Sequence, residues 1–336
     1  MRRPLIASML VLSLTVTSLA LIASPAAAIE TRGRGFDSWL RGNPANVDVA
    51  VSSGAMLEGG AQDLRAAWAW FLQRAGYGDI VIICATCTAE YNPYVASIHE
   101  VDSVQTLKIT KRIASSNPFV VDSVAGADGI FFAGGDQSDY LRIWNATPVS
   151  DAINAGIARG VPIGGISAGL AISGQFYFSA YKNTVVSAKA MQDCYGNKIQ
   201  VRRDLISYPA LAATITDSHF TQRGRLGRLL TFMSRILTDQ WAPAVRGLGI
   251  DESTAVLLDS GGTGQVIGSG TASFIRMTPS DVVTCAPGTP VSTGVVRVDV
   301  LSQGQSFDVA NWTGAPDPPT WAQITDGGLT YPVLIP

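Results

Sequence analysis

The sequence predicts an α/β protein with a mostly parallel sheet, helices on both faces of that sheet, and a β-rich C-terminal part. Short apolar runs typical of buried strands alternate with segments of helical period as far as about residue 260, a pattern that favours a parallel sheet. From about Gly261 glycine and threonine become frequent, and residues 295–301 alternate apolar and polar side chains as an antiparallel strand does. No internal repeat or low-complexity linker interrupts the chain, so residues 29–336 are expected to form one domain.

The individual elements follow from hydrophobic period. Leu64, Ala67, Trp68, Phe71 and Ala75 lie on one face of a helix. The tail from residue 312 to 336 has little periodicity and several prolines, so we expect a wrapping coil. The expected strands cover residues 46–53, 79–85, 104–109, 129–133, 160–164, 213–215, 247–252 and 295–301. The other expected helices cover residues 118–125, 147–159, 168–174 and 226–237.

The N-terminus has the form of a secretory signal peptide over residues 1–28. Arg2 and Arg3 precede an apolar run over residues 5–23, and small residues follow at 24–28. The run could instead anchor the chain in a membrane, but five serine and threonine residues dilute it. No later segment is apolar enough to span a bilayer. We therefore expect a secreted or periplasmic protein without a membrane segment after signal cleavage.

Composition excludes one class of partner and leaves the cysteines open. The net charge is −2 and charged residues make up 15% of the chain, which offers no electrostatic support for a nucleic-acid partner. The four cysteines, Cys84, Cys87, Cys194 and Cys285, are expected to form structural disulfides or inert thiols. Cys84-x-x-Cys87 could be a redox or metal motif, but there is no second such pair and only two histidines exist, so no metal is expected.

Gly165-Ile166-Ser167-Ala168-Gly169 is the most informative stretch of the sequence. A G-x-S-x-G segment between a strand and a helix is typical of a nucleophile elbow, which exposes the serine oxygen above the sheet. The backbone N–H of Ala168 then lies at a helix N-terminus, where it can bind an oxyanion. The alternative is an ordinary glycine-rich turn between a strand and a helix.

A serine nucleophile needs a base, and His99 and His219 are the two candidates. His219 follows a strand-like run and opens a helix, as expected of a site at a strand end, whereas His99 lies in an irregular stretch. An α/β-hydrolase order would need an acid between serine and histidine, from Asp193, Asp204 or Asp217. Instead an apolar strand after His219 ends in Asp251-Glu252, and we interpret Glu252 as the orienting acid. The two acids could also simply cap the turn after that strand.

Four blocks of the chain together resemble the peptidase S51 family, and within it cyanophycinases rather than aspartyl dipeptidases. The third block, D-x-H-F-x-Q-R-x-R-x-x-R, is the most specific, and the matches span about residues 46 to 310. The resemblance implies a flavodoxin-like, three-layer fold related to class I glutamine amidotransferases, without a cofactor and usually as a homodimer. It also implies hydrolysis of cyanophycin, a poly-aspartate backbone with arginines in isopeptide linkage, to β-aspartyl-arginine. The blocks are residues 129–137, 165–169, 217–228 and 249–252.

The resemblance also implies a role for each matching residue. Ser167 corresponds to the nucleophile, His219 to the base and Glu252 to the acid that orients it. The amides of Gly134, Gly135 and Asp136, with that of Ala168, correspond to the oxyanion hole. Arginine suits a carboxylate-bearing substrate because it binds a carboxylate through two parallel hydrogen bonds, although the same arginines could form a solvated basic face. The residues that correspond to the substrate-binding set are Gln137, Asp217, Arg223, Arg225 and Arg228.

Three departures from the family pattern leave the exact substrate open. Residues 52–55 read Ser-Ser-Gly-Ala where the family usually has Gly-Gly-Ala-Glu after its first strand, and residues 84–87 replace the usual Pro-Thr-Ala-Ser. Residues 239–243 lengthen the connection to Glu252. Another aspartyl or β-aspartyl peptide is therefore an alternative substrate. An esterase or lipase, and a non-catalytic binding homologue, are the alternative functions.

Overall fold

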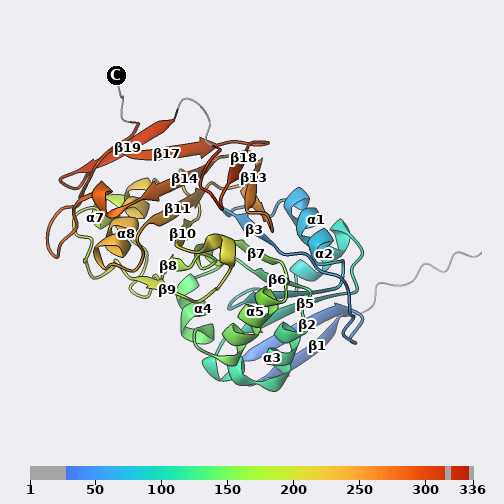
Figure 1. Cartoon of the computed structure of the whole chain (residues 1–336). Helices are drawn as coiled ribbons and strands as arrows, with labels where there is room; N and C mark the ends of the chain where they lie inside the picture. Colours follow the sequence, from blue (N-terminus) through green and yellow to red (C-terminus); the bar gives the residue numbers. More distant parts are fainter. Residues whose placement is uncertain (1–27, 315–318, 333–336) are drawn as a thin grey trace, which may run out of the picture.

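The computed structural model describes residues 28–314 and 319–332. The predicted signal peptide therefore lies, apart from Ala28, outside the described residues. Among the helices of the described part, none combines the length and apolar character needed to cross a bilayer. The strands form two large sheets, one central in Figure 1 and one at its upper left.

The first sheet has a parallel centre and antiparallel margins. Its five central strands, β5-β4-β6-β7-β3, pair in parallel, and the strands on either side of them pair antiparallel. When β4 to β7 are numbered 1 to 4 along the chain, their order across the sheet is 2-1-3-4, as in a doubly wound fold. The strand β3, which precedes all of them in the chain, lies beside β7 as the fifth strand. The strands, in order across the sheet, are β1 (Ile29–Gly33), β2 (Phe36–Gly42), β5 (Ser103–Ile109), β4 (Asp79–Cys84), β6 (Gly129–Phe132), β7 (Ile163–Ile166), β3 (Gly54–Glu58), β12 (Thr254–Asp259), β13 (Thr263–Gly268) and β18 (Ser306–Asp308).

The second sheet is mixed as well. Parallel pairing joins β8 to β10 and β10 to β11, and the other neighbours pair antiparallel. A two-stranded hairpin, β15 (Val282–Thr284) with β16 (Ser292–Thr293), lies outside both sheets. The strands, in order, are β20 (Gly328–Thr330), β19 (Thr320–Thr325), β17 (Val296–Leu301), β14 (Ala272–Met277), β11 (Val245–Ile250), β10 (Thr214–Asp217), β8 (Phe176–Phe178) and β9 (Val201–Arg203).

Helices cover both faces of the central parallel strands because successive strand residues alternate between two cores. Ile80 and Ile82 of β4 pack with α1 and α2, whereas Val81 and Ile83 pack with α3, α4 and α5 (Figure 1). The helix α8 packs on one face of the second sheet, and the opposite face, with Leu248 and Phe274, joins the core of the first sheet. The helices are α1 (Arg65–Arg74), α2 (Tyr91–Ile98), α3 (Pro118–Ala125), α4 (Gln137–Trp144), α5 (Pro148–Ala158), α6 (Ala168–Ala171), α7 (Ser187–Ala190) and α8 (Leu226–Thr238), with short 3₁₀ turns at Arg112–Ser116, Pro209–Leu211 and Pro279–Asp281.

Three expectations about the fold need correction. The mostly parallel sheet is right only for the five central strands, and the protein is a mixed α/β protein with two large mixed sheets. The first expected strand, residues 46–53, forms no strand, and β3 at Gly54–Glu58 takes its place. The alternating valines at residues 47–51 indicated a half-buried strand there. The strand β3 is instead buried on both faces, and such strands show no alternation of apolar and polar residues. The described part of the tail is not a coil, because β19 pairs antiparallel with β17 and buries Ala322 and Ile324 in the core beside α8.

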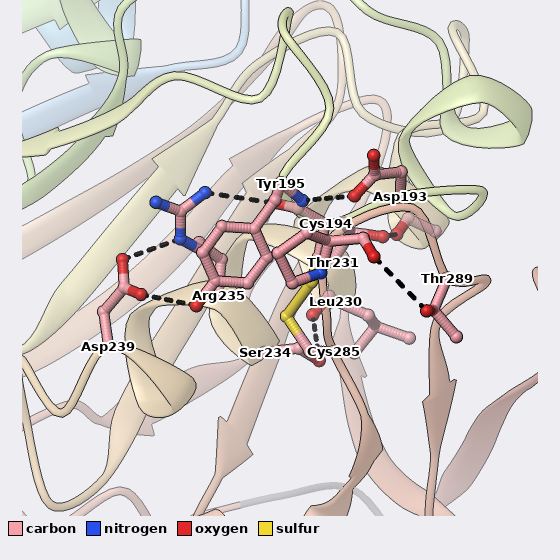
Figure 2. The surroundings of a disulfide bond; sticks show 12 residues. Asp193, Cys194, Tyr195, Leu230, Thr231, Ser234, Arg235, Asp239, Cys285 and Thr289 are labelled. Carbon is pink, nitrogen blue, oxygen red and sulfur yellow. Dashed lines mark hydrogen bonds and ion pairs between the residues drawn. A yellow bond between two sulfur atoms is a disulfide. The ribbon is translucent and has the colours of Figure 1, made fainter.

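All four cysteines are paired. Cys84 bonds to Cys87 in the turn after β4, and Cys194 bonds to Cys285 across a separation of 91 residues. The expectation of structural disulfides is therefore confirmed for both pairs, and the alternative of inert thiols is wrong. The second bridge attaches the segment after α7 to the end of β15, beside α8 (Figure 2).

Candidate active site

Ser167 lies on a strained turn between β7 and α6. Its backbone has φ 55° and ψ −107°, a conformation that L-residues rarely adopt and that is typical of a nucleophile elbow. The flanking glycines are required by close packing: a Cβ on Gly165 would lie 2.7 Å from the backbone carbon of Gly169, and one on Gly169 would collide with the carbonyl of Phe132. The Ser167 N–H donates to the carbonyl of Glu58 at 3.0 Å, which fixes the turn to the end of β3.

His219 connects Ser167 to Glu252. The Oγ of Ser167 is 2.8 Å from Nε2 of His219, and Nδ1 of His219 is 2.6 Å from Oε1 of Glu252. Because a carboxylate only accepts hydrogen bonds, Nδ1 donates to Glu252, and Nε2 is left to accept from the serine hydroxyl. The three residues thus form a hydrogen-bonded chain in the order Ser–His–acid that serine hydrolases use.

The environment of His219 favours the neutral form of its ring. Burial lowers the pKa of His219 below its usual value, and the positive charges of Arg223 and Arg225 act in the same direction. The hydrogen bond to Glu252 opposes these effects by raising the pKa. A neutral imidazole with a free Nε2 lone pair is the form that can take a proton from serine. His99, in contrast, is exposed and stacks on Tyr77, away from this site.

The two acids after β11 have different roles. Each oxygen of Asp251 accepts from both the N–H and the hydroxyl of one threonine, Thr221 on one side and Thr271 on the other. Asp251 therefore ties the loop after β10 to the strand β14, and Glu252 alone faces His219. Sequence reasoning missed Gln222, whose amide oxygen accepts the N–H of Glu252 at 3.0 Å.

The triad assembles where β3 ends between the two sheets. The N–H of His219 donates to the carbonyl of Gly59 at 2.9 Å, and the N–H of Ser253 donates to the carbonyl of Gly60 at 2.9 Å. The residues that follow β3 are therefore Gly59-Gly60-Ala61-Gln62, not residues 52–55. The departure noted at residues 52–55 therefore resulted from assigning the first strand to residues 46–53 instead of Gly54–Glu58.

Three backbone N–H groups beside Ser167 are available for an oxyanion. The amides of Gly135, Asp136 and Ala168 make no hydrogen bond to any other described residue, and all three residues line the cavity at Ser167. Donors held in place without a partner are what stabilise a developing negative charge in acyl transfer. The arrangement is consistent with the expected oxyanion hole.

Tyr140, which sequence reasoning missed, supports the loop that carries Gly135. Its buried hydroxyl is 2.9 Å from the carbonyl of Ala133 and 2.7 Å from that of Gly134, and its ring stacks on Trp144. Gly135 adopts φ 151°, and a Cβ there would lie 2.7 Å from the tyrosine oxygen. Because the single hydroxyl proton of Tyr140 is shared between these two carbonyls, both point toward the tyrosine, and the amides of Gly135 and Asp136 remain available to the cavity.

The cavity at Ser167 has a volume of about 320 Å³ and an excess of positive charge. The arginines predicted from the third block meet there, together with Gln137, whose amide donates to the carbonyl of Phe178. Asp204 and Asp193, which were also considered for the triad, do not line this cavity. Asp204 accepts a hydrogen bond from Gln175, and Asp193 lines a neighbouring cavity together with residues 183–186. Arg223, Arg225 and Arg228 all line this cavity.

Arg228 does not have the free guanidinium that substrate binding requires. Its Nε and Nη2 bind the two oxygens of Asp217 at 2.7 and 2.5 Å, and Nη1 binds the hydroxyl of Thr184 and the carbonyl of Val185. Four of its five N–H groups thus already donate within the protein, so Arg228 cannot bind a substrate carboxylate through two parallel hydrogen bonds. Asp217, predicted to bind substrate, is likewise enclosed by Arg228 and Arg225.

Arg225 and Arg223 differ in how much of their charge is available. Arg225 donates through Nη1 to Asp217 and Ser218, and burial lowers the pKa of Arg225 to about 10. Arg223 is exposed and has no side-chain hydrogen bond or ion pair with any part of the chain that the structure describes. Arg223 is therefore the most accessible cation at the cavity.

Within residues 28–314 and 319–332, no group of three or more histidine, cysteine or acidic side chains is placed to hold a metal ion. The sequence pattern that defines peptidase family S51 matches residues 49–264, more than half of the chain. The chain belongs to peptidase family S51. The four motif blocks and their order had predicted this family, and all four lie within or overlap the matched region.

Several known proteins are distantly similar to this chain. A cyanophycinase of Synechococcus elongatus is 26% identical over 270 residues, which are 76% of this chain and 78% of that protein. One of Geminocystis herdmanii is 25% identical over 273 residues, 77% of this chain and 94% of that protein. Among solved structures, a peptidase from an acI-B1 actinobacterium has a TM-score of 0.49 at 17% identity, covering 77% of this chain and 98% of that one. Membership of the family implies a peptide substrate.

Proposed function

We propose that this S51 protein is a serine peptidase that hydrolyses cyanophycin to β-aspartyl-arginine. The observation that carries the proposal is the Ser167–His219–Glu252 hydrogen-bond chain facing a cavity lined by arginines. The cyanophycinases similar to this chain support the choice of substrate.

The proposed reaction proceeds through an ester on Ser167. Nε2 of His219 takes the hydroxyl proton as Oγ adds to the scissile carbonyl, and the oxyanion receives hydrogen bonds from Gly135, Asp136 and Ala168. The C–N bond then breaks, and His219 delivers the proton to the leaving amine. Water attacks the ester after losing a proton to His219, which returns that proton to Ser167 as the acid product leaves.

Charge in the cavity supports an anionic substrate. In cyanophycin the aspartate side chain is consumed by the isopeptide bond, so the free carboxylate of each repeat belongs to its arginine. Three arginines outnumber two aspartates, Asp136 at the cavity wall and Asp217 behind Arg225 and Arg228, so the cavity keeps a cationic excess. Arg223 has its guanidinium free to bind such a carboxylate. Gln137 is placed to add a hydrogen bond from its amide.

The test is incubation with purified cyanophycin and detection of released β-aspartyl-arginine, with Ser167→Ala as the matched control. We expect the wild type to release the dipeptide and the variant to lose on the order of 10⁴- to 10⁶-fold in kcat. Equal release by both proteins would contradict the proposal. Hydrolysis of another β-aspartyl peptide but not cyanophycin would retain the chemistry and replace the substrate.

We also propose that the protein is exported. Arg2-Arg3, the apolar run after them and the small residues up to Ala28 support this proposal, as do two disulfides, which persist in oxidising compartments. Sequencing the N-terminus of protein recovered from outside the cytoplasm tests it, with Ile29 as the expected first residue. A recovered chain that begins at Met1 would contradict cleavage.

A further inference from the structure

We propose that a second cavity beside the active site binds the next repeats of the substrate chain. The cavity has a volume of about 670 Å³ and is formed by residues 183–186, 189, 193 and 196–199, which we call the lysine groove. Residues 183–186 also line the active-site cavity, so they form a ridge between the two. This inference rests on the proposed function, because it takes the ligand to be the same polymer.

The charges of the lysine groove match a polymer whose repeats carry both a carboxylate and a guanidinium. Lys189 and Lys198 are exposed, and neither forms an ion pair within the described part of the chain. Asp193 uses one carboxylate oxygen to accept the N–H of Tyr195 at 2.8 Å. The two lysines can therefore bind carboxylates, and the other oxygen of Asp193 can bind a guanidinium.

A rigid framework holds the lysine groove in place. The residue next to Asp193 is Cys194, which is bonded to Cys285 (Figure 2). Arg235 donates to the carbonyl of Cys194 at 3.3 Å and lies over the ring of Tyr195, and both Arg235 and Tyr195 bind Asp239. Arg235 is the next arginine of α8 after Arg228, and Figure 2 shows it in this support. This framework holds the backbone beside Asp193, and a preorganised site loses less entropy when a ligand binds.

The ridge between the cavities is tied to the active site. Thr184 and Val185 accept hydrogen bonds from Arg228, which is itself bound to Asp217. Val186 is 58% exposed on the ridge, where an extended chain would cross it. In our proposal a polymer bound at Ser167 continues over residues 183–186 into the lysine groove, and a short segment occupies the active-site cavity alone.

The proposal predicts that the lysines matter only for long substrates. We would measure kcat/KM on cyanophycin segments of two and four Asp-Arg repeats for the wild type and for the double variant Lys189→Ala/Lys198→Ala. Because two exposed charge contacts are lost, we expect a fall of about three- to tenfold on four repeats, mostly in KM, and little change on two. Lys182→Ala is the matched control, since Lys182 is an exposed lysine directly before the ridge at residues 183–186 and lines neither cavity.

Two further variants separate charge from folding. Lys189→Arg/Lys198→Arg should keep the preference for four repeats, and Lys189→Glu/Lys198→Glu should abolish it. Equal kcat/KM on two and four repeats by the wild type, or an equal loss on both lengths in the double alanine variant, would overturn the proposal.

Binding to Ser167→Ala distinguishes failure of the groove from failure of the proposed reaction. We would measure by calorimetry the affinity of Ser167→Ala for segments of two and four repeats, with and without the lysine substitutions. Tighter binding of four repeats that requires the lysines supports the groove even if the wild type hydrolyses neither segment. Affinity that depends on neither length nor the lysines would overturn it even if hydrolysis occurs.

Discussion

Gly60 lies directly against the imidazole of His219. A Cβ built on Gly60 would be 2.6 Å from Nε2, the nitrogen that bonds to Ser167, and the residue adopts φ 118°. The backbone directly after β3 therefore packs against the ring of His219, and a side chain at position 60 would not fit between them.

Gly60→Ala is expected to displace the base without removing any catalytic group. The methyl group must push His219 from Ser167, so kcat should fall at least about 100-fold, since small displacements of reacting groups cost that much. Strain at a positive φ should also lower the free energy of unfolding by about 1–3 kcal/mol. Steady-state kinetics and denaturant unfolding measure the two effects, with Gly288→Ala, a positive-φ glycine in open space, as the control for strain. An active Gly60→Ala would contradict this account.

His219→Ala should remove nearly all activity, whereas His99→Ala should change it little. Of the two histidines, only His219 contacts Ser167 within the described residues, whereas His99 stacks on Tyr77 at the surface and bonds through Nδ1 to the carbonyl of Glu100. Because triad members act together, we expect a loss on the order of 10⁴-fold or more in kcat for His219→Ala. Rates on cyanophycin for both variants decide the matter, and the reverse pattern would reassign the base.

The pH dependence of kcat/KM should report the lowered pKa of His219. The base must be neutral, so activity is lost as the pH falls through the pKa of His219, and burial places that loss below pH 6.5. Glu252→Gln removes an interaction that raises this pKa, so the acidic limb should move to still lower pH while kcat at pH 8 also falls. A limb that moves to higher pH in Glu252→Gln would show that Glu252 does not act on His219.

Arg223→Ala and Arg228→Ala should fail in different ways. Arg228→Ala leaves Asp217 buried with Arg225 as its remaining cationic partner, so the free energy of unfolding should fall by about 3–5 kcal/mol. Arg223→Ala removes an exposed cation and should lower kcat/KM on cyanophycin about fivefold, with little change in unfolding. Denaturant unfolding of both variants measures the loss of stability, and kcat/KM on cyanophycin measures the loss of recognition. The rate with an activated ester follows acylation of Ser167 in each variant. A stable Arg228→Ala with only a KM defect would restore Arg228 to direct substrate binding.

Tyr140→Phe should impair catalysis more than binding. The ring can still stack on Trp144, but the carbonyls of Ala133 and Gly134 lose their donor, and the amides of Gly135 and Asp136 become less well oriented. We expect kcat to fall about 10- to 100-fold with KM nearly unchanged, because the amides act chiefly in the transition state. A rise in KM at constant kcat would show that Tyr140 shapes the ground-state pocket instead.

The sequence by itself determined the features that depend on neighbouring residues. The elbow at 165–169 is a local turn whose glycines and serine are consecutive, and the helices α3 and α5 follow from period and from caps at Asn117 and Thr147. The order of Ser167, His219 and Glu252, with the block at 217–228, was enough to predict the family and a triad whose members meet in the structure.

Only the tertiary structure decided which distant groups meet. Asp217 and Arg228 both looked like ligands for substrate, yet they neutralise each other, because a buried charge is costly unless an opposite charge pairs with it. The division into two sheets, the place of β3 beside β7 and the bridge between Cys194 and Cys285 likewise join segments far apart in the chain. Hydrophobic period reports which face of a segment is buried but not which segment covers it, so these pairings are settled by packing in three dimensions.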